Sequence, residues 1–456
     1  MTTTAPTSVS ETYPHYAAAY AAQPADGPDA LVTLRQRGWD AFAKLGLPTA
    51  RRGNEPWKYT NVAPIAREAF THPDPLAVAD AGIDLAAVQR SAPWQADWRT
   101  LVFVDGVVAP GLCNVTAVGA SHVPSVDTLA DAISSGQGLD GTLSKLAEPE
   151  DDGFVALNTA FVRDGAAIVV PAGADAGVIN LVYLTTGREQ PRVTHPRTVI
   201  SAGANSRVTV IETFIGPGDT RYFTNAVMEA SLSEGARVEH YRLLLEGMDA
   251  YHVGTSRVNQ SKDSTFSSVS IAQGAALGRN DFGVTLAGTG VECTLNGLYL
   301  TNGSQHIDNY INIDHTEPYG TSRMFYKGIL DGRSRAVFGG NVTVRKDAQK
   351  TDAQQTDKNL LLSQEAEVDS KPSLLIYADD VKCGHGATAG HIDADTVFYM
   401  RSRGLDLPTA SRILIHAFAS EIIDTVALEP LRDYLDERFQ DAIPSANISL
   451  PIGGRS

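Results

Sequence analysis

A cysteine and a histidine stand two positions apart near the C-terminal end of the chain. They are Cys383 and His385, and Gly384 and Gly386 flank the histidine. Side chains alternate between the two faces of an extended strand, so this spacing places the thiol and the imidazole on one face. A thiolate and an imidazole on one face can share a transition metal, and the flanking glycines allow another backbone to approach closely.

The same spacing leaves two other interpretations open. In one, the segment is an ordinary turn-rich strand whose cysteine packs inward and whose histidine bonds a carbonyl group. In the other, Cys383 and His385 form a nucleophile pair, although no oxyanion-hole motif accompanies them. Lys382 could lower the thiol pKa, but it alternates to the opposite strand face. His391 would join the face of the pair only if the strand continued through Gly390.

A second group of possible metal ligands lies between residues 306 and 317. Its spacing is more typical of the polar face of exposed strands and their turns than of a metal site. Basic residues at 333–335 and 345–350 are interleaved with acidic ones and lack aromatic neighbours, so they indicate a solvated face or a protein interface rather than a nucleic-acid site. The members of the second group are His306, Asp308, Asp314, His315 and Glu317.

The overall charge limits the partners that this protein can have. Its 456 residues include 37 Lys and Arg against 53 Asp and Glu, which gives a net charge of −16 and a pI near 5.1. Such an acidic chain lacks the general attraction that nucleic acid or an anionic membrane requires, so we expect neither as a partner. The three cysteines, Cys113, Cys293 and Cys383, are too few for a cluster held by four thiolates and too scattered for a disulfide framework.

Several motifs of known enzyme classes are missing from the sequence. It contains no phosphate-binding loop, no dinucleotide-binding glycine motif, no G-x-S-x-G elbow and no H-E-x-x-H motif. We therefore expect no ATP site in this chain. Residues 1–10 have neither the basic residues nor the apolar run of a secretory signal, and no apolar stretch approaches the ~20 residues that span a bilayer. These features predict a cytoplasmic protein.

The elements that must position these residues differ along the chain. Residues 1–27 are rich in Thr, Ser, Ala and Pro, which predicts a disordered tail. Residues 29–46 carry apolar side chains at helical spacing before Gly46 and Pro48, which predicts an amphipathic helix. Residues 101–108 alternate around an Asp-Gly pair and predict a hairpin.

Short β-type runs separated by small residues fill the region from about 165 to 395. Turns such as 202–205, 234–236 and 288–290 precede alternating runs, at irregular intervals of ~30 residues. This pattern favours the rungs of a β-solenoid. An antiparallel sandwich would give the same short strands, and periodicity cannot choose between parallel and antiparallel pairing.

Helical periodicity returns over the last ~50 residues. Asp406 can cap a helix that begins near Leu407, and a second amphipathic run starts just after Pro430. Two such short helices cannot fold alone, so they either cap the solenoid or form a docking module. The predicted regions are a disordered tail over 1–27, a helical region over 28–100, a transition segment with a hairpin over 101–164, a β-helix core over 165–398 and C-terminal helices over 399–456.

Several stretches of this sequence resemble the SufB/SufD family. The match extends from residue 338 to residue 404 and includes the runs 348–355, 359–363, 371–372, 378–388 and 398–404. Near the N-terminus, residues 55–60 resemble a tryptophan motif of the family.

Within the family the chain is more similar to the SufD branch than to SufB. Gly386 follows His385 where SufB-like chains usually carry Glu, and the chain is poor in cysteine. It departs from the family pattern at Pro56, at His391 and at Leu375, which replaces a frequent Glu. The loss of that acid implies that any charge relay through position 375 is missing here.

The resemblance implies a mainly β fold, with a right-handed parallel β-helix core flanked by N-terminal and C-terminal α-helical regions. It also implies a non-catalytic scaffold subunit for iron–sulfur cluster assembly that works with SufB and the ABC-type ATPase SufC. The C-terminal helices would dock SufC. The β-helix edge would pair with SufB, or with a second copy of this chain when it is isolated.

Carried over to this sequence, the metal ligand at the shared interface falls on His385, with Cys383 as a lesser candidate. The ligated group would be iron, or a transient iron–sulfur cluster shared with SufB, and the chain would contribute to iron acquisition. A neutral imidazole is a workable iron ligand near pH 7. Some complexes of the family contain reduced flavin, and no pattern in this sequence locates a flavin site.

Two alternative functions remain open from the sequence. A SufB-like scaffold subunit would accept persulfide sulfur on a cysteine of this chain. Parallel β-helices also act on polysaccharides, usually as secreted proteins with clustered acidic or basic residues in a groove.

Overall fold

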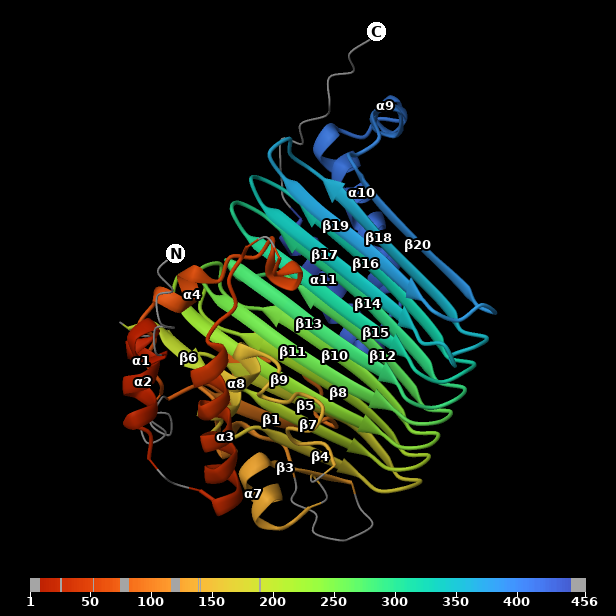
Figure 1. Cartoon of the computed structure of the whole chain (residues 1–456). Helices are drawn as coiled ribbons and strands as arrows, with labels where there is room; N and C mark the ends of the chain where they lie inside the picture. The colour runs from red at the N-terminus through yellow and green to blue at the C-terminus, as the bar shows by residue number, and fades with distance from the viewer. Residues whose placement is uncertain are drawn as a thin grey trace, which may run out of the picture.

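Two long β-sheets face each other in the body of the protein, and helices lie at both ends of the chain (Figure 1). The computed structural model describes residues 9–24, 27–51, 53–73, 82–115, 124–137, 139, 141–187 and 190–443. None of the helices in these ranges is both long and apolar enough to cross a membrane.

From residue 197 onward the chain alternates between the two sheets, so that each coil gives one strand to each. Sheet 1 contains, in spatial order, β2 (Val107–Val108), β1 (Arg99–Val104), β5 (Asp175–Leu184), β8 (Arg207–Ile215), β10 (Arg237–Leu245), β12 (Thr265–Ala272), β14 (Glu292–Thr301), β16 (Thr321–Leu330), β18 (Asp352–Leu361) and β20 (Lys382–Gly390). Sheet 2 contains β19 (Glu367–Ile376), β17 (Arg335–Val344), β15 (His306–His315), β13 (Leu277–Leu286), β11 (Tyr251–Gln260), β9 (Tyr222–Leu232), β7 (Arg197–Ala202), β4 (Ala166–Val170) and β3 (Ser125–Thr128), and β6 (Arg192–Thr194) pairs with β9.

Successive coils pair in parallel. The pairing is parallel from β5 to β20 in sheet 1 and from β4 to β19 in sheet 2. The predicted parallel β-helix core is therefore confirmed, and the antiparallel sandwich is excluded. The predicted hairpin at 101–108 is also confirmed, because β1 and β2 pair antiparallel across Asp105 and Gly106.

Side chains of equivalent strand positions stack from coil to coil in the interior. Val238, Phe266 and Cys293 lie in register on β10, β12 and β14, and all three are buried in one apolar cluster. Alternate positions face outward, as the period of an extended strand requires. Burial of these stacked apolar side chains stabilises each coil against the next.

The small-residue turns of the sequence lie at the corners between strands. Gly235 has a φ of 67°, in the left-handed region that favours glycine. A side chain there would also collide with Asn205 of the preceding coil, because a Cβ atom would lie 2.3 Å from the Asn205 Oδ1. Consecutive corners can therefore stack this closely only when one of the two contacting residues is a glycine.

Most of the N-terminal helices pack against the outer face of sheet 2 and the first coils (Figure 1), whereas the helix over Leu85–Ser91 lies on sheet 1, where Val88 joins an apolar cluster with Val182. The predicted helix over 29–46 is confirmed as α3, whose residues contact α8. The helices and 3-10 turns before β4 are α1 (Val9–Thr12), α2 (Pro14–Ala21), α3 (Asp29–Leu45), η1 (Glu55–Trp57), α4 (Ala63–Arg67), α6 (Leu85–Ser91), η2 (Pro110–Leu112), α7 (Leu129–Ser134) and α8 (Gly153–Phe161).

The prediction of a disordered tail over 1–27 was wrong for α2. Tyr16 of α2 is fully buried, and its ring centroid lies 5.9 Å from that of Phe42 on α3. The Leu47 N–H donates to the Tyr13 hydroxyl oxygen, with 3.1 Å between the two atoms. These aromatic contacts order the segment, although its composition resembles that of a disordered tail. Residues 1–8, 25 and 26 of the predicted tail lie outside the described residues.

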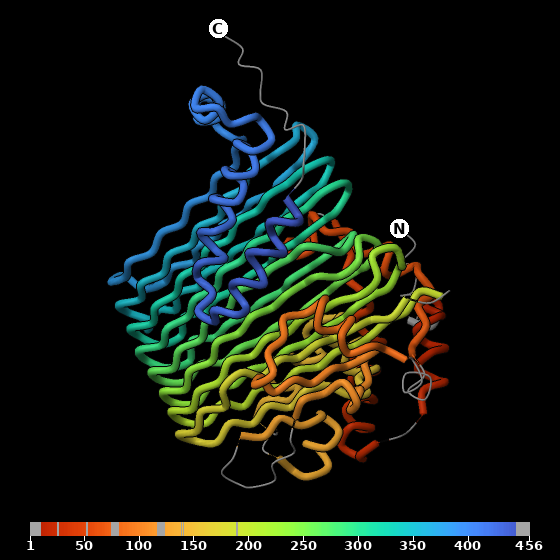
Figure 2. The backbone as a smooth tube through the Cα atoms, turned by 180° about the vertical axis from the view of Figure 1, so that it is seen from behind, coloured from red at the N-terminus to blue at the C-terminus, as the bar shows by residue number. Residues whose placement is uncertain are grey.

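The last two C-terminal helices lie across the outer face of sheet 1 and do not cap the end of the solenoid (Figure 2), whereas the first one projects beyond the last coil (Figure 1). They are α9 (Ala394–Ser402), α10 (Leu407–Ile423) and α11 (Glu429–Ala442). Ile415 and Ile422 of α10 are fully buried in a cluster with Leu298 of β14 and Ile329 of β16. As predicted, Asp406 caps α10 by accepting from the Thr409 N–H. The helices pack on the side of the body because apolar side chains of these strands face outward there.

A buried ion pair fastens the segment before α8 to sheet 2. Arg197 of β7 and Glu229 of β9 are both buried, and Arg197 Nη2 lies 2.5 Å from Glu229 Oε1. The backbone N–H groups of residues 144–147 donate to the same carboxylate. One carboxylate therefore holds a guanidinium group and a turn of backbone in place.

Replacing Glu229 with Gln should destabilise the protein by roughly 3–5 kcal/mol, because Arg197 is left charged and buried without a counter-charge. The matched control is Glu234→Gln, whose carboxylate is exposed beside Lys262 and should matter little. Urea unfolding followed by circular dichroism measures both variants. An E229Q variant as stable as E234Q would contradict the anchoring role.

Candidate functional site

The last coil carries the cysteine and the histidine that the sequence singles out. Both lie on β20, where Cys383 pairs in register with Ala353 and His385 with Gln355 of β18. Ala353 and Gln355 are buried, and the Gln355 side chain donates to the carbonyl of Gly340 on the opposite sheet. Paired residues of a parallel ladder share one face of the sheet. The structure therefore places Cys383 and His385 together on the interior side of β20, as their spacing predicts.

Both side chains lie on the last strand of sheet 1 in the described part of the chain, but they differ in exposure. The Cys383 side chain is half-buried and packs against the interior apolar cluster. Burial raises the pKa of its thiol, so the neutral thiol predominates at pH 7. This burial argues against the nucleophile interpretation. The His385 side chain is exposed, and among the described residues its ring has no hydrogen-bond partner.

His391 does not join this pair. It follows the end of β20, and its Nδ1 lies 2.8 Å from the carbonyl oxygen of Leu361. The ring therefore donates an N–H to that carbonyl, in a contact that fixes the chain between β20 and α9.

The described residues do not form a complete metal site by themselves. Among them, no three His, Cys, Asp or Glu side chains are grouped so that they could hold a metal ion. Cys383 and His385 supply two donor atoms at most. A metal at this place would need further ligands from outside the described residues.

The second group of candidates from the sequence is spread over three environments. His315 points inward and lies 2.9 Å from the Ser322 hydroxyl through its Nε2. Asp314 pairs with Arg345 at the surface. Asp308 is buried on the outer face of sheet 2, where it binds Arg279. These residues therefore serve structure rather than one common metal site.

The interior beneath β20 is polar, which the sequence analysis missed. Gln355, Asp357 and Asn359 of β18 all point inward and are buried. The Asn359 amide and the Ser370 hydroxyl donate to Oδ2 of Asp357 over 2.8 and 2.7 Å, whereas Asp357 Oδ1 has no partner among the described residues. The available signal was the alternation of polar residues at positions 355, 357 and 359, where a buried strand is normally apolar.

Long, regular edge strands surround this polar floor. In the described part of the chain, β19 and β20 each end the order of their sheet, so one side of each backbone lacks a strand partner. Apolar side chains beside this edge are exposed, with Leu375 at 50% and Tyr377 at 63%. Unpaired edges of this kind are templates for pairing with another chain.

Replacing Asp357 with Asn should stabilise the protein at pH 7 but not at pH 4. Burial raises the pKa of Asp357 to about 6, from the ordinary 3.8. The folded state therefore favours the protonated carboxyl, and this group lowers stability as the pH rises from about 4 to 6. The difference corresponds to roughly 3 kcal/mol at pH 7. Urea unfolding of both proteins at pH 4.5, 5.5 and 7 measures the difference between their free energies of unfolding. A difference that does not grow with pH would contradict the prediction.

Comparison with known proteins gives two family matches that together cover most of the chain. The SufBD protein N-terminal region matches residues 8–178, and the SufBD core domain of the SUF system for FeS cluster assembly matches residues 183–418. The resemblance seen in the sequence is confirmed by these matches.

Individual relatives agree with this assignment. The chain is 32% identical over 413 residues to the iron–sulfur cluster assembly protein SufD of Escherichia coli, a match that covers 90% of this chain and 92% of the relative. It is 33% identical over 417 residues to an iron–sulfur cluster assembly SufBD family protein of Synechocystis, covering 89% of each. SufD of Bacillus subtilis is 26% identical over 290 residues, covering 62% of this chain and 65% of the relative. The chain therefore belongs to the SufBD family of the SUF system, which assembles iron–sulfur clusters.

Proposed function

We propose that this chain is a SufD-type, non-catalytic scaffold subunit of a cytoplasmic SUF assembly complex. It pairs with SufB through the open end of its solenoid and binds the ATPase SufC through its C-terminal helices. At the interface with SufB it contributes to iron acquisition and offers His385 as a ligand to iron, or to a cluster under assembly. The observation that carries this proposal is the difference between the two ends of the solenoid.

The two ends of the solenoid differ in the direction of their terminal strands. At the first end, β3 pairs antiparallel with β4 and β2 pairs antiparallel with β1, so both sheets close with a reversed strand. At the other end, β19 and β20 remain in the parallel direction of the ladder, with strand lengths of 10 and 9 residues. An edge that is long, regular and lined by exposed apolar side chains favours strand pairing with another solenoid.

The place of His385 on this edge explains why its ligand set is incomplete. Its exposed ring lies on the interior side of the last strand, so a partner that extends the solenoid would enclose it. The remaining ligands would then come from the partner, and Cys383 would supply a second donor only after losing its proton. The polar floor below β20 provides surroundings in which a charged group costs less than in an apolar interior.

The C-terminal helices offer a separate surface for the ATPase. α9 projects beyond the last coil (Figure 1). Its aromatic side chains are exposed, with Phe398 at 75% and Tyr399 at 58%. Exposed aromatic residues are typical anchors of protein interfaces. The chain has no phosphate-binding loop of its own, so ATP hydrolysis would come from the partner.

The first test is co-expression of the full chain with SufB and SufC of the same source, and purification without oxygen. Light scattering should give a complex of one copy of this chain with one SufB and two SufC. In that complex, His385→Ala should keep the mass but lower the content of iron and sulfide, because one ligand is lost and no core contact is. His391→Ala is the matched control and should keep both.

Two results would count against this proposal. A chain that elutes alone or only as a homodimer in the presence of SufB would refute the pairing. Unchanged iron and sulfide in the His385→Ala complex would refute the ligand role.

A double substitution of Phe398 and Tyr399 by Ser should weaken SufC binding by roughly tenfold or more, because two aromatic anchors are removed. Point substitutions are preferable to deletion of residues 405–456, since α10 covers apolar side chains of sheet 1. Tyr319→Ser is the control, because Tyr319 is an exposed tyrosine on a turn between β15 and β16. Calorimetric titration with SufC measures the effect, and unchanged affinity, or loss of SufB pairing instead, would contradict the assignment.

A further inference from the structure

The sequence contains two Asn-Gly pairs, and the fold places them in opposite surroundings. Asn302 and Gly303 belong to the turn between β14 and β15, and both are exposed. Asn296 and Gly297 lie inside β14. The backbone nitrogen of a glycine can attack the side-chain amide of a preceding asparagine, because glycine has no Cβ atom to hinder the approach. The position in the fold therefore determines which pair reacts.

The geometry of the exposed pair favours this attack. The Gly303 N–H donates to Asn302 Oδ1 over 2.5 Å, so the nitrogen faces the side-chain carbonyl group that it would attack. Among the described residues, the Gly303 N–H has no other acceptor. The nitrogen is therefore not held in a strand ladder and can close a ring with its own neighbour.

The other pair is held by the sheet. Asn296 is 8% exposed, and its side-chain amide donates to the hydroxyl of Thr425, just after α10, over 3.2 Å. Gly297 pairs in register with Ser270 of β12 on one side and with Tyr326 of β16 on the other. The backbone N–H groups of a strand between two neighbours are committed to the ladder. The Gly297 nitrogen would have to leave the sheet before it could attack.

We propose that Asn302 is a site of spontaneous deamidation. The Gly303 nitrogen forms a bond to Cγ of Asn302 while the bond from Cγ to Nδ2 breaks, and the proton of the Gly303 N–H leaves with the amide group as ammonia. Water then opens the cyclic imide at one of its carbonyl groups. Opening at the side-chain carbonyl gives aspartate, and opening at the main-chain carbonyl gives isoaspartate, so the reaction consumes only water.

The two products differ in how well they fit this corner. The next corner, between β16 and β17, already has an aspartate at the equivalent place: the Gly332 N–H donates to Asp331 Oδ1 over 2.8 Å, and φ is 66° at Gly332 and 61° at Gly303. The aspartate product therefore fits. Isoaspartate adds a carbon atom to the main chain where the corners pack closely, since a Cβ atom at Gly332 would lie 2.8 Å from the Gly303 nitrogen. The isoaspartate product would therefore disturb the contact between the two corners.

Peptide mapping of the full chain after incubation at pH 8 tests the site. Chymotrypsin is the suitable protease, because it cuts after Tyr299 and so separates the two pairs. The peptide that contains Asn302 should gain the mass that replaces an amide with an acid and should separate into aspartate and isoaspartate forms. The peptide that contains Asn296 should keep its mass, and it should react only when the chain is incubated in urea. No mass gain at Asn302, or an equal gain at both asparagines in the folded chain, would overturn the proposal.

Two glycine variants test the role of the Gly303 nitrogen. Gly303→Ala should slow deamidation at Asn302 by roughly tenfold or more, because the added Cβ atom hinders the attack. Gly173→Ala is the matched control: Gly173 also has a positive φ, of 73°, and a Cβ atom would meet nothing within 4 Å at either glycine. This control should leave the rate at Asn302 unchanged. Equal rates at Asn302 in the two variants would contradict attack by the Gly303 nitrogen.

Discussion

Every coil of this protein relies on the next one for its backbone hydrogen bonds. In a parallel ladder, the N–H and C=O groups on one side of a strand are satisfied only when another strand follows, so a solenoid always has two ends to close. Here the first end closes with the reversed strands β2 and β3, whereas β19 and β20 keep the direction of the ladder. The open end, the exposure of His385 and the case for a partner solenoid all follow from this one constraint.

The same stacking decides how polar side chains are tolerated inside the body. In the middle coils, buried carboxylates have histidine partners: His240 Nε2 lies 3.0 Å from a Glu212 oxygen, and His252 Nδ1 lies 2.7 Å from a Glu246 oxygen. On β18, next to the terminal strand β20, the described residues give Asp357 only neutral donors, so burial raises its pKa. A buried carboxyl group with a raised pKa is tolerated near the end of the solenoid, because a partner or solvent is near.

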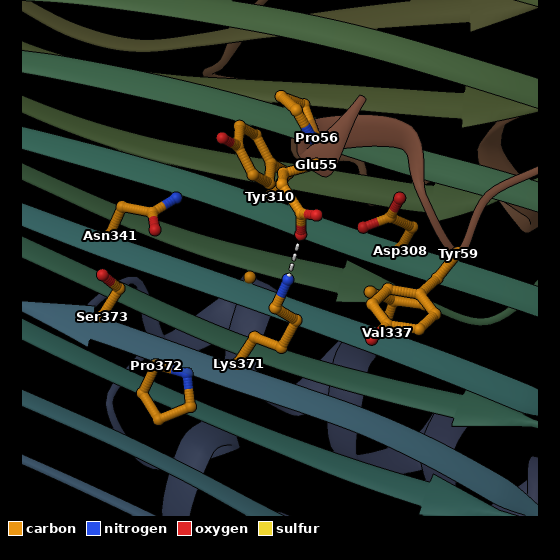
Figure 3. Close-up of a pocket in the computed structure, with 11 residues that line it drawn as sticks. Glu55, Pro56, Tyr59, Asp308, Tyr310, Val337, Asn341, Lys371, Pro372 and Ser373 are labelled. Carbon is orange, nitrogen blue, oxygen red and sulfur yellow. Dashed lines mark hydrogen bonds and ion pairs between the residues drawn. The ribbon is translucent and has the colours of Figure 1, made fainter. Parts of the chain in front are cut away.

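The N-terminal segment is tied to the outer face of sheet 2 by one buried cation. The Arg279 guanidinium lies 3.9 Å from the Trp57 ring centroid and pairs with both Asp281 and Asp308. From this anchor the segment reaches Lys371 on the edge strand β19 through Glu55. The motif at residues 55–60 is thus attached to β19, the strand that borders the open end, and a small pocket lined by Tyr59 and Lys371 lies at the junction (Figure 3).

Features that depend on neighbours a few positions apart were predictable from the order of the residues. The alternation that puts Cys383 beside His385, the capping of α10 by Asp406 and the hairpin at Asp105 were all predicted, because strand period, helix caps and turns are local properties. The family was also visible in contiguous motifs. The ordering of α2 was missed, since its stabilising contact is with Phe42 on another helix.

Features that depend on the register between distant strands became visible only in the folded chain. A period of two residues is the same in parallel and antiparallel strands, so the solenoid could not be distinguished from a sandwich by pattern alone. An amphipathic helix does not reveal which apolar face it will cover, so α10 was not placed on the side of sheet 1. The environment of Asp357 and the meeting of Glu55 with Lys371 exist only once the coils are stacked, because stacking alone brings residues far apart in the chain within contact distance.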